Sequence, residues 1–261
     1  MNPLQIHDAG GVITLTLDRP AVRNAINDAL MAALDNTTQA LMDRKDLVAI
    51  ILTGAGEKAF CAGGDLRWLQ TLQTQQEGEA MSQRMQNILH RLADLPVPVI
   101  GVLNGHAIGG GTEIALACDI RIIESHAWMC WKQARMGLLT GWGGGSRLLR
   151  AVGYARALEL VTTCRRVSAT EACALGLAND TAPTGSGLQN AKAMAHEIRK
   201  GAPGSVAAFK NLFQSIGAMS PQDAATIERM HFRAAWDGAA HREAVSAFFE
   251  KRSPMFRNRN E

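Results

Sequence analysis

The chain has 261 residues, 47% of them hydrophobic, and a formal charge of +3. This composition predicts one large or two small folded domains and excludes a disordered chain, while the mild, scattered positive charge suits an anionic small molecule better than nucleic acid. No apolar run approaches the roughly 20 residues that a membrane helix needs, so no membrane partner is expected.

Strands and helices alternate in the first half of the sequence. Period-two alternation of apolar and polar residues indicates half-buried strands, continuous apolar runs of five to eight residues or so indicate strands buried on both faces, and apolar residues at helical spacing indicate a helix. The predicted elements are, in order, a strand within 11–20, a helix within 26–44, and strands within 47–54, 97–105 and 119–125.

The second half of the sequence is mostly helical in pattern. A chain that alternates strands and helices and then continues in helices is typical of an α/β core with a helical C-terminal part. Residues 181–187, TAPTGSG, are the best candidate for a linker. The predicted helices are 146–152, 155–162, 169–175, 189–200, 205–216, 221–236 and 241–251.

The cysteines and histidines show no metal-binding or disulfide spacing. Five cysteines occur without a C-x-x-C pair, and the first residues lack the basic and apolar segments of a secretion signal. We therefore expect reduced thiols in a cytosol-like, cytoplasmic compartment, most of them small buried hydrophobic side chains. The seven histidines are dispersed, so no structural metal is expected.

One motif imitates a nucleotide site. Residues 53–60, TGAGEKAF, follow a predicted strand and resemble the dinucleotide fingerprint. That fingerprint requires a helix to open at its last glycines, whereas here the chain runs into a second turn cluster, FCAGGD. A Rossmann site is therefore not expected. Phosphate-binding G-K-[ST] and nucleophile-elbow G-x-S-x-G motifs are absent from the sequence.

Two short glycine clusters, each after a strand and before a helix, attract more attention. One contains Gly63 and Gly64, and the other is the run 109–111. Glycine lets a ligand approach bare backbone N–H groups, and a helix N-terminus adds unpaired donors with a partial positive charge. If the two preceding strands are neighbours, two N–H groups can converge on one oxygen, an oxyanion hole in which each donor contributes about 3 kcal/mol.

Glu113 lies one turn into the second of these helices, among almost exclusively apolar neighbours. A partly desolvated carboxyl in a pocket suits general acid–base chemistry. Two simpler interpretations stay open. The glycines can serve only tight turns and close helix–sheet packing, and an acid in a first helical turn can simply favour the helix dipole.

The sequence resembles the crotonase, or enoyl-CoA hydratase/isomerase, superfamily over nearly its whole length. Five segments carry the resemblance in order: LDRPAVRNAIN, KAFCAGGDL, NGHAIGGGTEIALACD, MGLLTGWGGGSRLLRAVG and EAVSAFFEKR. The resemblance implies a spiral of ββα units followed by helices that build homotrimers, often paired as dimers of trimers. It implies acyl-CoA thioesters as substrates in fatty acid metabolism, with no metal or redox cofactor. The implied spiral core with the acyl-CoA site spans 1–195, and the helical region for oligomerisation and the CoA lid spans 196–261.

The resemblance also implies site residues. The backbone N–H groups of Gly64 and Gly110 would form the oxyanion hole, and Glu113 matches the first catalytic glutamate of hydratases. Pocket lining is expected from the mixed stretch 66–90. The residues expected to bind substrate or CoA are Arg23, Ala25, Ala62, Gly64, Asp65, Leu66, Arg67, Gly110, Trp142, Phe248 and Lys251. For Lys251, a solvated helix end is the alternative.

One position departs from the hydratase pattern. Hydratases carry a second glutamate four residues before the glycine of MG, and this chain has Gln133 there. An amide does not exchange a proton near neutral pH, so the departure argues against two-acid hydration and against ordinary double-bond isomerisation.

Decarboxylation of a malonyl-type thioester is compatible with Gln133, because loss of CO2 needs no base and leaves an enolate that the two N–H donors stabilise. A second glutamate would repel the substrate carboxylate by about 4 kcal/mol at a separation of about 4 Å and an effective dielectric constant of about 20. An ionised Glu113 would repel it as well. The segments around Trp142 and Trp236 resemble the ethylmalonyl-CoA decarboxylase branch, although tryptophans are also common core residues.

The leading prediction is therefore a lyase that decarboxylates a malonyl-type acyl-CoA. The alternative within the family is an enoyl-CoA hydratase or isomerase that uses Glu113 alone. An alternative of another class is a non-catalytic acyl-CoA-binding protein, against which Glu113 and both glycine clusters argue.

Overall fold

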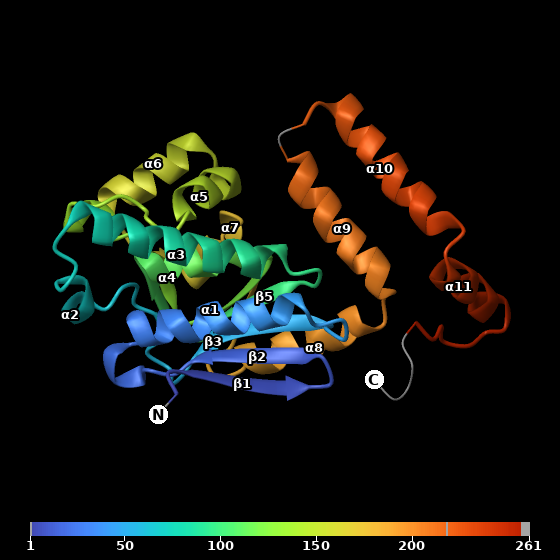
Figure 1. Ribbon diagram of the computed structural model, residues 1–261, viewed down its shortest axis with the longest axis horizontal. Helices are drawn as coiled ribbons and strands as arrows, with labels where there is room; N and C mark the ends of the chain where they lie inside the picture. The colour runs from blue at the N-terminus through green and yellow to red at the C-terminus, as the bar shows by residue number, and fades with distance from the viewer. Residues whose placement is uncertain (1, 218, 257–261) are drawn as a thin grey trace.

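The computed structural model describes residues 2–217 and 219–256. Figure 1 shows an α/β core that runs from the N-terminus to helix α8 (Gly187–Arg199), and an arm of helices that stands beside it. The predicted succession of an α/β half and a helical half is confirmed. No helix in the described ranges is both long and apolar enough to span a bilayer.

A six-stranded sheet forms the base of the core, in the order β1-β2-β3-β5-β7-β10. Strands β1 and β2 are antiparallel, and all other neighbours in this sheet are parallel. Four of the strands, β2, β3, β5 and β7, lie within the strand segments predicted from the sequence. The strands are β1 (Leu4–Ala9), β2 (Val12–Leu17), β3 (Ala49–Gly54), β5 (Val99–Leu103), β7 (Ile120–Glu124) and β10 (Asp180–Ala182).

A second, four-stranded sheet has the order β4-β6-β8-β9. Its first three strands are parallel, and β9 runs antiparallel to β8. The chain therefore passes from β3 to β4, from β5 to β6 and from β7 to β8, and after each pair it enters helices, which is a spiral of ββα units. The strands are β4 (Ala59–Cys61), β6 (His106–Ile108), β8 (Trp128–Cys130) and β9 (Val167–Ser168).

Helices cover both faces of the large sheet and fill the turns of the spiral (Figure 1). Those of the core are the short η1 (Pro20–Val22) and η2 (Gln133–Met136), and α1 (Asp28–Met42), α2 (Leu66–Leu69), α3 (Gln75–Asp94), α4 (Gly110–Ala117), α5 (Gly144–Val152), α6 (Tyr154–Thr163), α7 (Ala169–Ala174) and α8. The arm consists of α9 (Pro203–Ile216), α10 (Pro221–Trp236) and α11 (Ala239–Phe249).

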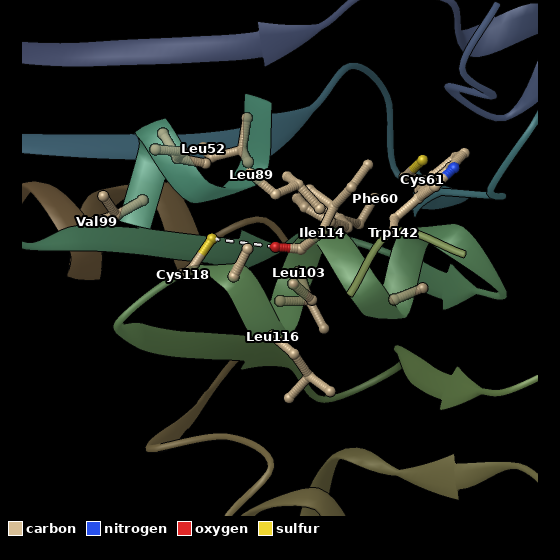
Figure 2. Packing of buried hydrophobic residues seen from close by; sticks show 14 of the residues in the cluster. Leu52, Phe60, Cys61, Leu89, Val99, Leu103, Ile114, Leu116, Cys118 and Trp142 are labelled. Atoms are coloured by element: carbon tan, nitrogen blue, oxygen red, sulfur yellow. Dashed lines mark hydrogen bonds between the residues drawn. The ribbon is translucent and has the colours of Figure 1, made fainter. Parts of the chain in front are cut away.

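Two apolar clusters stabilise the core, one on each side of the large sheet. In β3, Ile50 and Leu52 pack into the cluster that also contains α1, α3 and α4, whereas Ile51 faces the smaller cluster beneath α8. Every residue of β3 and β5 is buried, which confirms the prediction of strands covered on both faces. Figure 2 shows the larger cluster around Ile114, whose carbonyl accepts a hydrogen bond from the Cys118 thiol.

The structure corrects the predicted linker. Residues 180–182 form the edge strand β10, and α8 begins at Gly187 and packs on the sheet, so 181–187 connects two elements of the α/β core. The implied division after residue 195 falls within α8. Strand β1 and the long helix α3 were not anticipated, and neither were the short strands β4, β6, β8, β9 and β10. Helix α3 occupies much of the stretch expected to line the pocket.

Other expectations about the core are met. Cys61, Cys118, Cys130 and Cys164 are buried, and only Cys173 is half-buried. After the glycines of TGAGEKAF the chain enters strand β4 rather than a helix, in agreement with the prediction that this motif does not form a dinucleotide site.

Candidate active site

The two glycine clusters meet in the structure. Each contains a residue in the left-handed region that glycine tolerates, Gly63 with φ of +89° and Gly109 with φ of +54°. A Cβ on Gly63 would lie 3.0 Å from the backbone nitrogen of Gly110, and a Cβ on Gly111 would lie 2.0 Å from the carbonyl oxygen of Cys61. Side chains are excluded here because the segment after β4 and the first turn of α4 touch.

This contact places two unused donors near each other. Within the described ranges, neither the backbone N–H of Gly64 nor that of Gly110 donates to a protein acceptor. Gly110 opens α4, so its N–H belongs to the unpaired first turn and lies at the positive end of the helix dipole. The arrangement agrees with the expected oxyanion hole, and convergence of both N–H groups on one substrate oxygen stays a prediction.

Glu113 is buried beside these donors, with 2% of its surface exposed. Its Oε2 accepts hydrogen bonds of 2.8 Å from the backbone N–H groups of both Trp142 and Gly144, and its Oε1 accepts one of 3.0 Å from the Gln133 amide. Burial raises the pKa of the Glu113 carboxyl above the ordinary 4.5, although these hydrogen bonds act in the opposite direction. The group therefore retains its proton to higher pH than an exposed glutamate.

Gln133 opens η2 and faces Glu113 directly. Its Nε2 donates to the acid, while its Oε1 is buried and finds no partner among the described residues. A buried amide oxygen without a donor carries a desolvation cost, so it is ready to accept a hydrogen bond from a ligand or water. Rotation of the amide by about 180° would exchange the two ends, with little change in shape.

Trp142 joins the loop before α5 to the rest of the site. Besides its backbone bond to Glu113, its indole is 5% exposed and covers the first turn of α4: a Cβ on Gly110 would lie 2.1 Å from the ring. The indole N–H points to the Met81 sulfur on α3 at 3.3 Å. Trp142 is thus both a core residue and a wall of the site, next to Phe60 and Cys61 in Figure 2.

Several of the predicted CoA-binding residues lie on the segment beside the oxyanion donors. Arg23 adopts φ of +55°, and its carbonyl accepts a hydrogen bond from the N–H of Ala62. Ala25 is buried. Asp65 pairs with Arg19 at 2.9 Å and caps α2, and Leu66 and Arg67 follow it on the surface.

The remaining predicted residues are not brought to Glu113 within one chain. Phe248 is 78% exposed near the end of α11, and Lys251 follows that helix, on the arm that stands apart from α4 in Figure 1. Trp236 is 60% exposed at the end of α10, so the interpretation of this tryptophan as a core residue is wrong for the isolated chain.

Sequence reasoning missed the part played by Gly144. A Cβ at this position would lie 2.3 Å from Glu113 Cγ, and its N–H holds the carboxylate. The signal was a third glycine cluster before a helix, GWGGG at 141–145, which served only to suggest a branch of the family. No cluster of three His, Cys, Asp or Glu side chains suited to a metal occurs in the part of the chain that the structure describes.

Comparison with known proteins places this chain in a family. The family model for enoyl-CoA hydratase/isomerase matches residues 7–259. The short-chain-enoyl-CoA hydratase of Clostridium acetobutylicum is 33% identical over 260 residues, which cover 99% of each chain. The ethylmalonyl-CoA decarboxylase of Gallus gallus is 33% identical over 240 residues, 90% of this chain and 80% of that protein.

Solved structures agree with the sequence comparison. The enoyl-CoA hydratase from Bacillus anthracis superposes with a TM-score of 0.93 at 31% identity and covers 97% of this chain and 98% of that one. DspI from Pseudomonas aeruginosa also gives a TM-score of 0.93 at 31% identity, with 98% and 97% coverage. The fold is therefore the expected crotonase spiral with a helical C-terminal region, and the chain belongs to the enoyl-CoA hydratase/isomerase family.

Proposed function

We propose that this protein decarboxylates a malonyl-type acyl-CoA thioester. The observation that carries the proposal is the hydrogen bond from Gln133 to Glu113. Gln133 places a neutral amide where hydratases carry a second glutamate. The site therefore holds one acid, and no second carboxylate there repels an anionic substrate.

The reaction divides among few groups. The thioester oxygen accepts hydrogen bonds from the N–H groups of Gly64 and Gly110, and the bond from Cα to the substrate carboxylate breaks. Its electron pair moves into the thioester to form an enolate, and CO2 leaves. The developing negative charge on the oxygen is stabilised by donors that are already oriented, which is where such sites gain most of their rate.

Glu113 returns the proton. Burial raises the pKa of Glu113, so more of it is protonated than of an exposed glutamate, and the protonated form donates to Cα of the enolate and restores a saturated thioester. Solvent then reprotonates the carboxylate for the next cycle.

Gln133 suits this cycle in both protonation states of Glu113. Opposite an ionised Glu113 the amide donates through Nε2, as observed. Opposite a neutral Glu113 the rotated amide accepts a hydrogen bond from the acid O–H through Oε1, and Nε2 is free to donate to the substrate carboxylate. The unpartnered Oε1 in the structure supports this exchange.

Hydration of an enoyl-CoA with Glu113 as the sole acid–base group is the second candidate. It is favoured by the names of relatives such as the hydratases of Clostridium acetobutylicum and Bacillus anthracis. Against it stands Gln133, which cannot hold or exchange the second proton.

A substrate panel separates the two candidates. Purified protein is incubated with methylmalonyl-CoA, ethylmalonyl-CoA and crotonyl-CoA, and CO2 release and loss of the enoyl chromophore are recorded. The proposal expects turnover of at least one malonyl-type thioester and slow hydration. Hydration at tens per second, a rate usual for enzymes, together with no CO2 release, would contradict it.

We also propose that the chain works as a homotrimer or a dimer of trimers. The arm carries exposed aromatic side chains that the chain itself does not cover, and a C-terminal lid over CoA would have to come from a neighbouring copy. The exposed apolar side chains of the arm include Phe209, Phe213, Met230, Phe232, Trp236, Phe248 and Phe249.

A further inference from the structure

A cavity of about 500 Å³ opens at the starts of strands β4, β6 and β8 of the small sheet. Its lining includes Arg23, Lys58 and Arg166, the two imidazoles of His106 and His126, and one acid, Glu57. Among the residues assigned above, only Arg23 takes part in it. The cavity is therefore a feature that the catalytic arrangement around Glu113 does not explain.

The cations of this cavity are not neutralised by protein. In the described ranges, the side chains of Arg23, Lys58 and Arg166 form no ion pair, although other arginines of the chain do so repeatedly. They come from three segments far apart in sequence, so the fold itself gathers them. Three cations against one acid leave a local excess of positive charge, which attracts an anion.

Aromatic stacking holds one of these cations in place. The Arg166 guanidinium lies 4.5 Å from the centre of the Trp128 ring, and the His106 ring stacks on the same indole with centroids 4.3 Å apart and an angle of 24°. A stacked guanidinium keeps its edge free for hydrogen bonds and loses little conformational entropy when an anion arrives.

The imidazoles are partly fixed as well. His126 contacts the Glu57 carbonyl oxygen at 2.9 Å through Nε2 and the Thr184 hydroxyl at 3.0 Å through Nδ1. The Nδ1 of His106 is buried without a protein partner in the described part of the chain. One wall of the cavity thus carries an unused polar atom beside the stacked Arg166.

We propose that this cavity binds a phosphate group, with Arg166, Lys58 and Arg23 as its cationic ligands. A phosphate dianion offers several acceptor oxygens that point in different directions. The donors of a guanidinium edge and of an ammonium group match these oxygens better than they match a single carboxylate. The phosphate is either a free phosphate-type anion or part of the nucleotide of a bound CoA. The inference does not depend on the reaction proposed above.

Titration with inorganic pyrophosphate tests the site at low ionic strength. Isothermal titration compares the wild type with Arg166→Ala and Lys58→Ala, and Arg156→Ala on the exposed face of α6 serves as the control that removes one arginine outside the cavity. We expect each cavity variant to bind about tenfold or more weakly, which is the loss of one charge-assisted contact, and the control to bind as the wild type does. Thermal unfolding verifies that each variant is folded.

Competition identifies the source of the phosphate. Displacement of pyrophosphate by CoA, with CoA binding weakened by Arg166→Ala, assigns the cavity to the nucleotide. Simultaneous binding of both, with only pyrophosphate affected by the variant, assigns it to a free anion. If pyrophosphate does not bind the wild type at millimolar concentration, or binds all variants equally, the phosphate site is refuted, whatever the substrate panel shows.

Discussion

The candidate active site and the helical arm differ in how far the chain itself covers their side chains. Glu113 is a buried acid, and both of its oxygens accept hydrogen bonds from the same chain. On the arm, by contrast, α10 has no buried residue in the described chain, and Phe232 and Trp236 lie open to solvent. The core therefore holds this acid through its own hydrogen bonds, whereas the arm leaves apolar surface exposed.

The joint between the two regions is a buried ion pair. Lys210 on α9 is 9% exposed, and it donates to Asp119 at 2.8 Å and to the Val97 carbonyl at 2.9 Å. The arm is therefore anchored at its first helix, and the helices beyond it contact mainly each other. Mutations at the site, in the arm and at this joint test the contrast between the two regions.

The largest effect is expected at the site itself. Glu113→Gln keeps the shape and the two backbone hydrogen bonds but removes the proton donor, so turnover should fall about 10²- to 10⁴-fold in the reaction that the wild type catalyses. Steady-state kinetics measure the loss. Glu124→Gln is the matched control, because Glu124 is 3% exposed and also accepts two glycine N–H groups, from Gly185 and Gly187, outside the site. Equal losses in the two variants would indicate a structural role for Glu113.

The next effect concerns the arm. Phe248→Asp combined with Phe249→Asp places two charges where we expect a neighbouring copy to pack, and the trimer should dissociate toward monomers at micromolar concentration, as light scattering would record. Ala240→Asp, an exposed position in the first turn of the same helix, should leave assembly intact. A wild type that is monomeric under these conditions would remove the basis of the proposed assembly.

A smaller effect is expected at the joint. Lys210→Met removes the cation and retains the aliphatic length, which leaves Asp119 without its partner. Because Asp119 is 26% exposed and still accepts a hydrogen bond from the Val99 N–H, we expect a loss of about 1–3 kcal/mol in the free energy of unfolding, less than for a fully buried pair. Denaturant titration measures this loss, and an unchanged midpoint would show that the pair does not hold the arm.

The smallest effect is a pH dependence of stability. The pKa of Glu113 is raised on folding, so folding favours the protonated form and this contribution is lost as pH rises from about the ordinary value of 4.5 through the folded pKa. The Tm of Glu113→Gln minus the Tm of the wild type should therefore rise across this pH window and level off above it. A constant difference from pH 4 to 8 would mean that burial of the acid is fully offset by its hydrogen bonds.

How far the sequence predicts this molecule differs between the same regions. Periodicity located β2, β7 and the helices after residue 143, because their apolar residues repeat at a fixed period, and continuous apolar runs located β3 and β5. It missed α3, although Thr74 and Glu77 form a capping box at its start, since few of its residues are apolar and its surface side is strongly polar. The strands of the small sheet, two or three residues long, are too short to carry a period.

For the site, composition alone could identify the glycine clusters but not their contact. That Gly63 lies against Gly110 depends on how two strands of the small sheet pair, which no local pattern encodes. The backbone donors to Glu113 were also out of reach, because every residue carries an N–H and only the fold decides which N–H is free. The part of the site that the sequence could predict was the identity of side chains such as Gln133.

The central claim is that Gln133 in place of an acid suits the site to an anionic substrate. The direct measurement is the pair of kcat/KM values for ethylmalonyl-CoA decarboxylation and crotonyl-CoA hydration in the wild type and in Gln133→Glu. We predict that the variant loses decarboxylation, chiefly through a higher KM from the added charge, and gains hydration because a second titratable group is present. Unchanged decarboxylation in Gln133→Glu, or a wild type that only hydrates, would contradict the account.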